Sequence, residues 1–192
     1  MALLTAQEIA QMGFQSVGKN VQLSNRASFY NCAQISIGDH VRIDDFCVLS
    51  AGVGGIFIGS HVHIAVYSSL IGAGEIVLSD FANISSKVSI YSSSDDYSGE
   101  WMTNPTIPAK FTGVTHGKVF IGRHVIVGCN SVILPNIALA DGVAIGALSL
   151  VNKDCAAFGI YAGSPAKRIK ERSRNLLALE QAFLAANPSN SF

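Results

Sequence analysis

Charged residues are scarce in this sequence, and neither sign dominates. Only 14% of the 192 residues are Asp, Glu, Lys or Arg, and 13 basic residues balance 13 acidic ones. This balance argues against a general nucleic-acid-binding protein, which needs a basic surface to neutralise phosphates. Because hydrophobic residues make up 49%, a disordered chain and a charged coiled coil are also excluded.

Long apolar runs and paired cysteines are missing as well. No stretch of about 18 apolar residues is present, which argues against a membrane-spanning helix. The N-terminus lacks the basic start and apolar core of a signal peptide, and we therefore expect a cytoplasmic protein. The cysteines form no Cys-x-x-Cys pair, and we expect them to be reduced, buried small residues. They are Cys32, Cys47, Cys129 and Cys155.

What the sequence does contain is a six-residue period. The same step recurs from Ile37, Ile58 and Leu78, and a weaker series starts at Val17. Small or β-branched residues stand four positions after these aliphatic residues, and Gly, Ala or Asp often follows them directly. The longest unbroken series is Ile121, Val127, Ile133, Leu139, Ile145 and Val151.

This period predicts stacked parallel strands. An α-helix cannot keep a period of six on one face, whereas a parallel β-helix places each hexapeptide on one side of a triangular coil. Neighbouring coils then bury each other's aliphatic faces. A Gly after the aliphatic residue would permit the positive φ that a tight turn needs. We therefore predict an all-β fold, a parallel β-helix.

Two segments do not follow the six-residue period: an N-terminal helix and a loop that interrupts the repeat. Residues 5–12 fit a short helix in which Thr5 and Glu8 have capping-box spacing, and this helix would cover the open first coil. The repeat stops at an extruded loop of about residues 91–118, which holds the only Trp and an Asp-Asp pair. A long loop inside a compact repeat is usually functional.

Apolar residues recur at helical spacing after Pro165, which predicts an amphipathic C-terminal helix. The chain after Asn187 is expected to fray. The predicted organisation is a single domain, 1–192, made of an N-terminal cap (1–16), a β-helix with its loop (17–164), and a C-terminal helix and tail (165–192).

Two C-terminal motifs carry a family resemblance. The stretch from Ile145 to Asp154, Ile-Gly-Ala-Leu-Ser-Leu-Val-Asn-Lys-Asp, precedes Tyr161-Ala-Gly-Ser-Pro-Ala-Lys-Arg-Ile-Lys170. With the period over residues 17–170, they resemble the hexapeptide-repeat acyltransferases, closest to sugar and maltose or galactoside O-acetyltransferases and to acetyltransferases of bacterial polysaccharide biosynthesis. The resemblance implies a left-handed β-helix, a homotrimer, and acetyl-coenzyme A as co-substrate, with no metal expected.

The resemblance also implies a place for coenzyme A, because the last coils of the family line a groove between two subunits. It would put Cys129, Ala147 and Asn152 along the pantetheine. Lys167 and Lys170 would face the nucleotide phosphates, where cations stabilise anionic charge. The basic run that contains these two lysines equally fits a solvated face.

Catalysis needs an oxyanion donor and, for a hydroxyl acceptor, a base. The O-acetyltransferases of the family use a His at the start of the extruded loop, where this sequence has Asp95. One hypothesis is that Asp95 or Asp96 binds an acceptor ammonium or acts as a weak base, which suits an amine acceptor. The other is that His116 or His63 supplies the base. The residues expected to bind the acceptor are Asp96, Tyr91 and Trp101.

We therefore expect an enzyme that moves acetyl from acetyl-coenzyme A to an amino or hydroxyl group of a sugar. A nucleotide-linked amino sugar is a candidate acceptor, in the synthesis of a bacterial surface polysaccharide such as O-antigen lipopolysaccharide. An amino-acid or xenobiotic acetyltransferase of the same fold is an alternative. So is a zinc trimer like γ-carbonic anhydrase, although its His pair five residues apart is missing. A structural repeat protein would not explain the loop.

Overall fold

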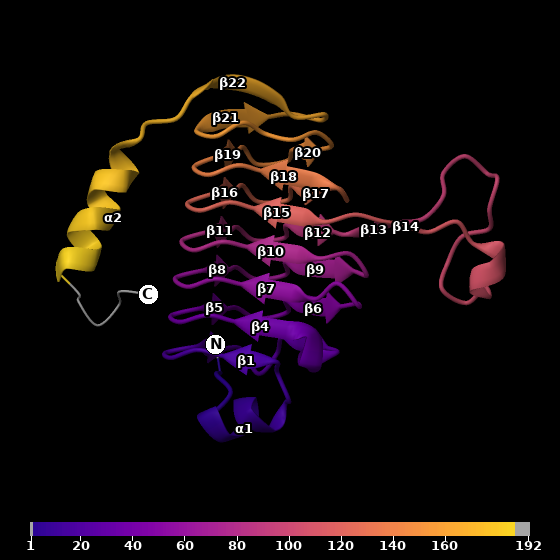
Figure 1. Cartoon of the computed structure of the whole chain (residues 1–192), viewed down its shortest axis with the longest axis horizontal. Helices are drawn as coiled ribbons and strands as arrows, with labels where there is room; N and C mark the ends of the chain where they lie inside the picture. The colour runs from indigo at the N-terminus through magenta and orange to yellow at the C-terminus, as the bar shows by residue number, and fades with distance from the viewer. Residues whose placement is uncertain (1, 187–192) are drawn as a thin grey trace.

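The computed structural model describes residues 2–186, which form a tall stack of coils (Figure 1). Each coil before β21 (Gly159–Ala162) contributes one strand to each of three sheets, and the parallel β-helix is left-handed, as the family resemblance implied. Sheet 1 consists of β1 (Ser16–Val17), β4 (Ile35–Ile37), β7 (Ile56–Ile58), β10 (Ile76–Leu78), β15 (Val119–Ile121) and β18 (Ile137–Leu139).

The other two sheets close the triangle. Sheet 2 consists of β2 (Gln22–Leu23), β5 (Arg42–Ile43), β8 (His63–Ile64), β11 (Asn83–Ile84), β16 (Ile126–Val127), β19 (Ala144–Ile145), β21 (Gly159–Ala162) and β22 (Lys167–Glu171). Sheet 3 consists of β3 (Ser28–Tyr30), β6 (Val48–Ala51), β9 (Ser69–Gly72), β12 (Ser89–Tyr91), β17 (Val132–Ile133) and β20 (Leu150–Val151). Two short 3₁₀ turns, Cys32–Gln34 and Ala109–Phe111, complete the elements outside the helices and the loop strands.

The aliphatic residues of the six-residue period form the core between these sheets. Ile76 pairs with Ile56 on one side and with Val119 on the other, so identical positions of successive coils lie directly above each other. The whole series from Ile121 to Val151 is at most 3% exposed. Each fully buried side chain of this size contributes about 1.5–3 kcal/mol. The predicted period is therefore confirmed as the packing repeat of the coil.

The glycines of the repeat serve close stacking rather than the positive φ expected from the sequence. A Cβ on Gly38 would lie 2.7 Å from the carbonyl carbon of Gly59 in the next coil. Positive φ occurs two residues after Gly38 and Gly59, at His40 (56°) and His61 (56°). The expectation that glycine provides the left-handed turn is wrong, because the positive φ falls on the histidines. Glycine is needed at its own position because the backbone of the next coil leaves no room for a side chain.

All four cysteines lie within the described residues and are free thiols, but they are not all buried. Cys47 and Cys155 are buried, and burial raises the pKa of each thiol to about 11. Cys32 is half-buried and Cys129 is exposed, so the expectation of burial is wrong for these two.

The N-terminal helix α1 (Ala6–Gln11) lies beneath the first coil, as predicted (Figure 1). Its capping box is formed: the Thr5 amide donates to the Glu8 carboxylate at 2.7 Å, and the Glu8 amide donates to Thr5 Oγ1 at 3.2 Å. Ile9 faces the coil and is 8% exposed. The helix thereby covers strand edges that would otherwise be open to pairing.

The C-terminal segment differs from the prediction. Residues 167–171 form strand β22, antiparallel to β21, and α2 begins only at Asn175 and ends at Ala186. The edge of β21 needs backbone partners, and this requirement overrides the helical spacing of the apolar residues. Arg172 then donates to the carbonyls of His124 and Gly142, at 2.8 and 3.1 Å. The tail expected to fray after Asn187 lies outside the described residues.

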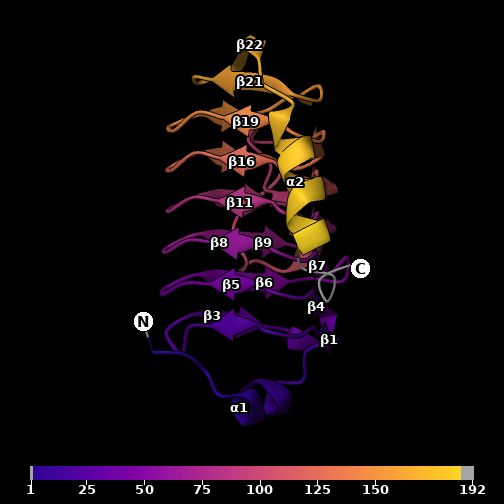
Figure 2. The same cartoon turned by 90° about the vertical axis from the view of Figure 1, so that its left-hand side faces the viewer.

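Helix α2 runs back down the stack along one corner (Figure 2). The corner carries stacked rings: His61 lies 4.6 Å from His40 and 5.0 Å from Phe81, measured between ring centroids. Phe183 of α2 meets the His61 ring edge-on at 5.3 Å. Glu180 of α2 accepts hydrogen bonds from the Arg123 guanidinium. Within residues 2–186, no helix combines the length and apolar character needed to cross a bilayer.

Candidate functional site

An extruded segment leaves the stack between β12 and β15, as predicted, and begins as a two-stranded ribbon (Figure 1). Strand β13 (Ser93–Ser94) pairs antiparallel with β14 (Thr115–His116), and Ser93 lies opposite His116. The corner below the ribbon contains Gly74, where a Cβ would lie 2.7 Å from the carbonyl oxygen of Gly117 and 2.8 Å from that of Ser92. The absence of a side chain at Gly74 lets the ribbon emerge against the coil.

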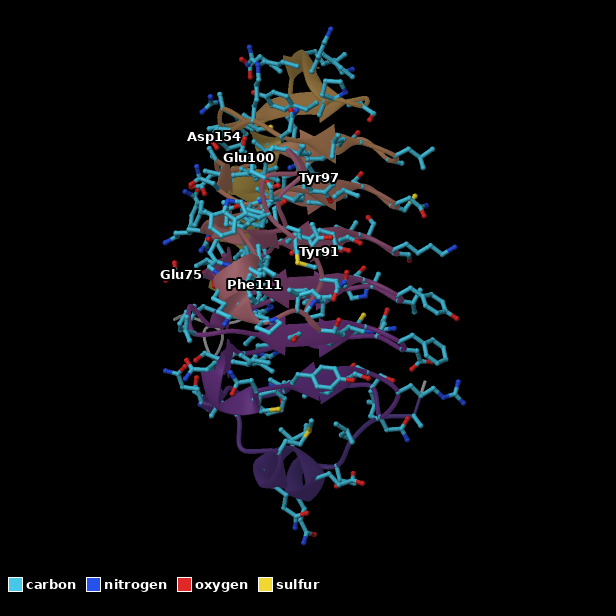
Figure 3. The ribbon with its side chains drawn as sticks, turned by 90° about the vertical axis from the view of Figure 1, so that its right-hand side faces the viewer. Glu75, Tyr91, Tyr97, Glu100, Phe111 and Asp154 are labelled. Carbon is cyan, nitrogen blue, oxygen red and sulfur yellow. The ribbon has the colours of Figure 1, made fainter. Side chains whose placement is uncertain are left out.

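Two hollows lie between this ribbon and the next coil, with volumes of about 500 and 400 Å³. They share Ser94, Leu134 and Pro135, so together they form one surface, which we call the ribbon groove. One hollow contains His116 and Asn152, and the other contains Tyr91, Asp95 and Tyr97. Figure 3 shows Tyr91 and Tyr97 on the side of the stack from which the segment emerges. The groove thus joins a catalytic candidate, His116, to a coenzyme A candidate, Asn152.

Asp95 and Asp96 occupy different environments despite being adjacent. Asp95 is exposed and lines both the ribbon groove and a third hollow of about 690 Å³ in the outer loop. Asp96 accepts hydrogen bonds from Ser98 Oγ at 2.8 Å and from the Gly99 amide at 2.9 Å. Chiefly the Ser98 hydroxyl bond lowers the pKa of Asp96 below its usual range. The Asp96 carboxylate therefore holds the loop's own turn.

Trp101 contacts Gly113 and lines the hollow of the outer loop. Its ring lies against Gly113, where a Cβ would come within 2.5 Å of the indole. It shares the outer hollow with Asp95 and Asp96 and is 51% exposed. An exposed aromatic face next to a carboxylate suits a ligand that carries both an apolar ring and a cation.

His116 is held by a hydroxyl group of the paired strand. Ser93 Oγ lies 2.7 Å from His116 Nδ1, and the Ala73 amide donates to the same Oγ at 2.7 Å. Ser93 is half-buried and His116 is exposed. The hydrogen bond therefore holds Nδ1 of the imidazole against the ribbon, and Nε2 lies on the opposite edge of the ring.

Most of the other coenzyme A candidates lie at a different corner. Cys129 accepts from the Leu148 amide at 2.9 Å through its carbonyl, so Cys129 and Ala147 occupy successive coils of one corner. Ala162 lies in the coil that follows the coil of Ala147, and Lys167 of β22 pairs with Ala162. We call Cys129, Ala147 and Lys167 the corner column. Sheet 3 separates the corner column from the ribbon groove. Lys170 is exposed and lies on β22 opposite Ile160.

His63 is placed away from both groups, on the outer surface of sheet 2. Its Nε2 lies 2.9 Å from Asp44 Oδ2, and its Nδ1 lies 3.3 Å from Asn83 Oδ1. Arg42 Nε donates to Asp44 at 2.7 Å. Burial raises the pKa of Asp44, but the hydrogen bonds and charges of His63 and Arg42 outweigh it, and the net shift is downward. Within one chain, His63 cannot reach the ribbon groove.

Several groove residues were not predicted from the sequence. Ser93, Tyr97 and Leu134 line the groove or contact its candidates. Ser93 stands in a run of three serines, but its contact with His116 spans 23 positions and depends on the ribbon's register. No local pattern encodes that pairing.

Comparison with known proteins identifies the family. The chain is 58% identical over 183 residues to a dTDP-4-amino-4,6-dideoxy-D-glucose acyltransferase of Escherichia coli, and the match covers 95% of each chain. The chain belongs to the hexapeptide-repeat sugar acyltransferases. No family model matches it. The acyltransferase therefore has the fold and the enzyme class that its C-terminal motifs predicted.

Solved structures agree with this assignment. The acyltransferase superposes on AntD, an N-acyltransferase from Bacillus cereus in complex with dTDP and 3-hydroxybutyryl-CoA, with a TM-score of 0.93, 45% identity and full coverage of both chains. It also resembles a maltose O-acetyltransferase from Clostridium difficile, with a TM-score of 0.58 and 21% identity over 88% of this chain and 75% of the other. The second likeness concerns the fold alone.

Proposed function

We propose that this acyltransferase moves an acyl group from a coenzyme A thioester to the amino group of a dTDP-linked amino-dideoxy sugar. The observation that carries this proposal is the 58% identity to an enzyme named for dTDP-4-amino-4,6-dideoxy-D-glucose. AntD, at 45% identity, has been crystallised with that nucleotide sugar and coenzyme A. Acetyl is the group predicted here, within a pathway of bacterial surface-polysaccharide synthesis.

An amine acceptor agrees with the chemistry of the ribbon groove. The sugar ammonium must lose a proton before its nitrogen can attack the thioester carbon. Asp95 is a carboxylate open to both the ribbon groove and the outer hollow, and we assign it as the group that holds the ammonium and takes its proton. Tyr91 and Trp101 would then border the sugar and its nucleotide.

The reaction is direct transfer without an acyl-enzyme. The amine nitrogen forms a bond to the thioester carbon, and the resulting oxyanion collapses with loss of the coenzyme A sulfur. The first proton that Asp95 takes from the ammonium is released to solvent. The nitrogen of the tetrahedral intermediate then loses its second proton through Asp95 to the leaving thiolate, so the products are the amide and the free thiol. Asn152 of the ribbon groove would bind the pantetheine through its amide, while Lys167 and Lys170 would contact phosphates.

A homotrimer completes the site in this proposal. The ribbon groove and the corner column lie on opposite edges of sheet 3, and in this proposal a neighbouring copy brings the two together. A second copy that packs its corner column against the first copy's ribbon would enclose the cofactor between them. His63 on sheet 2 would contribute only if sheet 2 of another copy faces the ribbon. We place the trimer in the cytoplasm, where its free thiols would stay reduced.

A thiol-release assay tests the proposed reaction. We expect acetyl-coenzyme A to release thiol with dTDP-4-amino-4,6-dideoxyglucose and not with the matched 4-hydroxy sugar nucleotide, because a hydroxyl would need a stronger base than a carboxylate. Equal release with both acceptors would favour O-acylation. No release with either acceptor would refute the proposed substrate class.

A further inference from the structure

The hydrogen bonds around Ser93 bear on which nitrogen of His116 carries a proton. The Ser93 hydroxyl has one proton to donate and two lone pairs to accept with. The Ala73 amide, at 2.7 Å, occupies one lone pair. Among residues 2–186, the acceptor that the Ser93 proton reaches is His116 Nδ1, also at 2.7 Å. In the arrangement that gives the hydroxyl proton a protein acceptor, Ser93 donates to Nδ1, whereas the reverse arrangement directs that proton to solvent.

A neutral His116 that accepts at Nδ1 must carry its proton on Nε2. The structure gives that nitrogen no hydrogen bond within residues 2–186, and His116 lines the ribbon groove beside Asn136 and Asn152. An Nε2–H group can donate a hydrogen bond into the groove but cannot accept a proton. In this tautomer, the Nε2 side of the histidine is a hydrogen-bond donor into the groove and not a general base.

Resting on the function proposed above, we infer that His116 Nε2–H donates to the thioester carbonyl oxygen of the acyl donor and stabilises the oxyanion of the tetrahedral intermediate. Ser93 is a positioning residue that selects the required tautomer. The nitrogen–carbon bond forms, the carbonyl electron pair moves to the oxygen, and the His116 proton stays on its nitrogen throughout. The first proton of the acceptor ammonium goes by way of Asp95 to solvent, and the second passes from the tetrahedral nitrogen through Asp95 to the leaving thiolate. In this mechanism His116 stabilises the oxyanion and Asp95 transfers protons.

Two substitutions at His116 separate a donor from a base. A glutamine amide can place an N–H near the position of Nε2, whereas an asparagine amide reaches only the position of Nδ1. We expect His116→Gln to keep at least about a tenth of the wild-type kcat, and His116→Asn to lose about 10²–10³-fold. The KM for acetyl-coenzyme A should stay unchanged in both variants, because the oxyanion forms only in the transition state and the intermediate and not in the bound substrate.

Other outcomes would overturn the inference. If His116 is the base, glutamine will be as inactive as asparagine. If His116 binds a ground-state carbonyl of the pantetheine, the asparagine variant will raise KM and leave kcat unchanged. The fluorescence of Trp101, the only Trp in the chain, checks that the extruded segment remains folded in each variant.

The positioning role of Ser93 has a spectroscopic readout. We expect ¹⁵N NMR of the wild-type protein to show His116 as the Nε2–H tautomer, and Ser93→Ala to show a mixture of the two tautomers with a several-fold lower kcat. Ser93→Thr keeps the hydroxyl and should restore both. A wild-type Nδ1–H tautomer would refute the inference. The NMR measurement needs no substrate, so it tests the tautomer even if the proposed reaction is wrong. The wild-type thiol-release assay tests the reaction itself.

Discussion

Asp95 and Asp96 show how neighbouring residues of the same type take different tasks. Asp96 uses its oxygens on the Ser98 hydroxyl and on the amides of Gly99 and Trp101. Asp95 lines two hollows and leaves its carboxylate exposed. A carboxylate already engaged with its own loop is less available to a ligand cation. The catalytic role proposed above therefore stays with Asp95, while the observed bonds of Asp96 support the loop.

Isosteric variants test this division. We expect Asp95→Asn to lower kcat about 10²–10⁴-fold, because an amide cannot take the acceptor's proton, with the KM for acetyl-coenzyme A unchanged. Asp96→Asn should instead alter Trp101 fluorescence and raise the KM for the nucleotide sugar. Steady-state kinetics with both substrates provide the measurement. Normal turnover in Asp95→Asn would remove Asp95 from the mechanism.

At the scale of the element, α2 docks on the stack through a small ion network and a ring contact. Glu180 accepts from Arg123 Nε at 3.0 Å and from His124 Nε2, and Arg123 also donates to Asp80 at 2.6 Å. Chiefly the Arg123 hydrogen bond lowers the pKa of Glu180 below 4.5. Phe183 supplies the apolar contact. Protonation of Glu180 would remove the charge that these bonds depend on.

The lowered pKa gives α2 docking a defined pH dependence. The stabilising contribution of Glu180 is complete above its unfolded pKa, near 4.5, and is lost as the pH falls through the lower folded value. We expect hydrogen exchange of residues 175–186, relative to that of the coil, to accelerate as the pH falls below 4.5 and through the lower folded pKa. Glu180→Gln should exchange fast already at pH 7 and lose this acid step. A Glu180→Gln variant whose helix is as protected at pH 7 as that of the wild type would contradict the assignment.

At the scale of the whole molecule, the proposed trimer makes the active site a shared structure. Asp95 belongs to the ribbon of one copy, and Ala147 belongs to the corner column that would face it from the next. Ala147 is exposed and small, so a bulky residue there would block a thin pantetheine chain. Each single variant, Asp95→Asn or Ala147→Trp, should then inactivate every site of its own trimer.

Mixing the two inactive variants tests this arrangement. After unfolding and joint refolding at equal amounts, random trimers would contain one intact site in each mixed assembly, and we expect about a quarter of the wild-type activity. Separately refolded variants, combined afterwards, are the control and should stay inactive. Light scattering measures the mass of the assembly. If joint refolding restores nothing, the two corners do not form one site.

The amino-acid sequence by itself determined the coil, because its information is local and repeated. Every hexapeptide places one aliphatic residue in the core, and stacking imposes the same demand on each coil. The capping box of α1 and the interruption at residues 91–118 follow from equally local patterns. The C-terminal motifs predicted the acyltransferase family for the same reason.

Only the tertiary structure decided where chemistry gathers. The contact of Ser93 with His116 depends on strand register across 23 positions, and the separation of Cys129 and Ala147 from the ribbon depends on which corner each occupies. Residues 167–171 form a strand, against their helical spacing, because the edge of β21 needs partners. Backbone pairing between distant segments set these features, and a pattern within one segment carries no record of its partner.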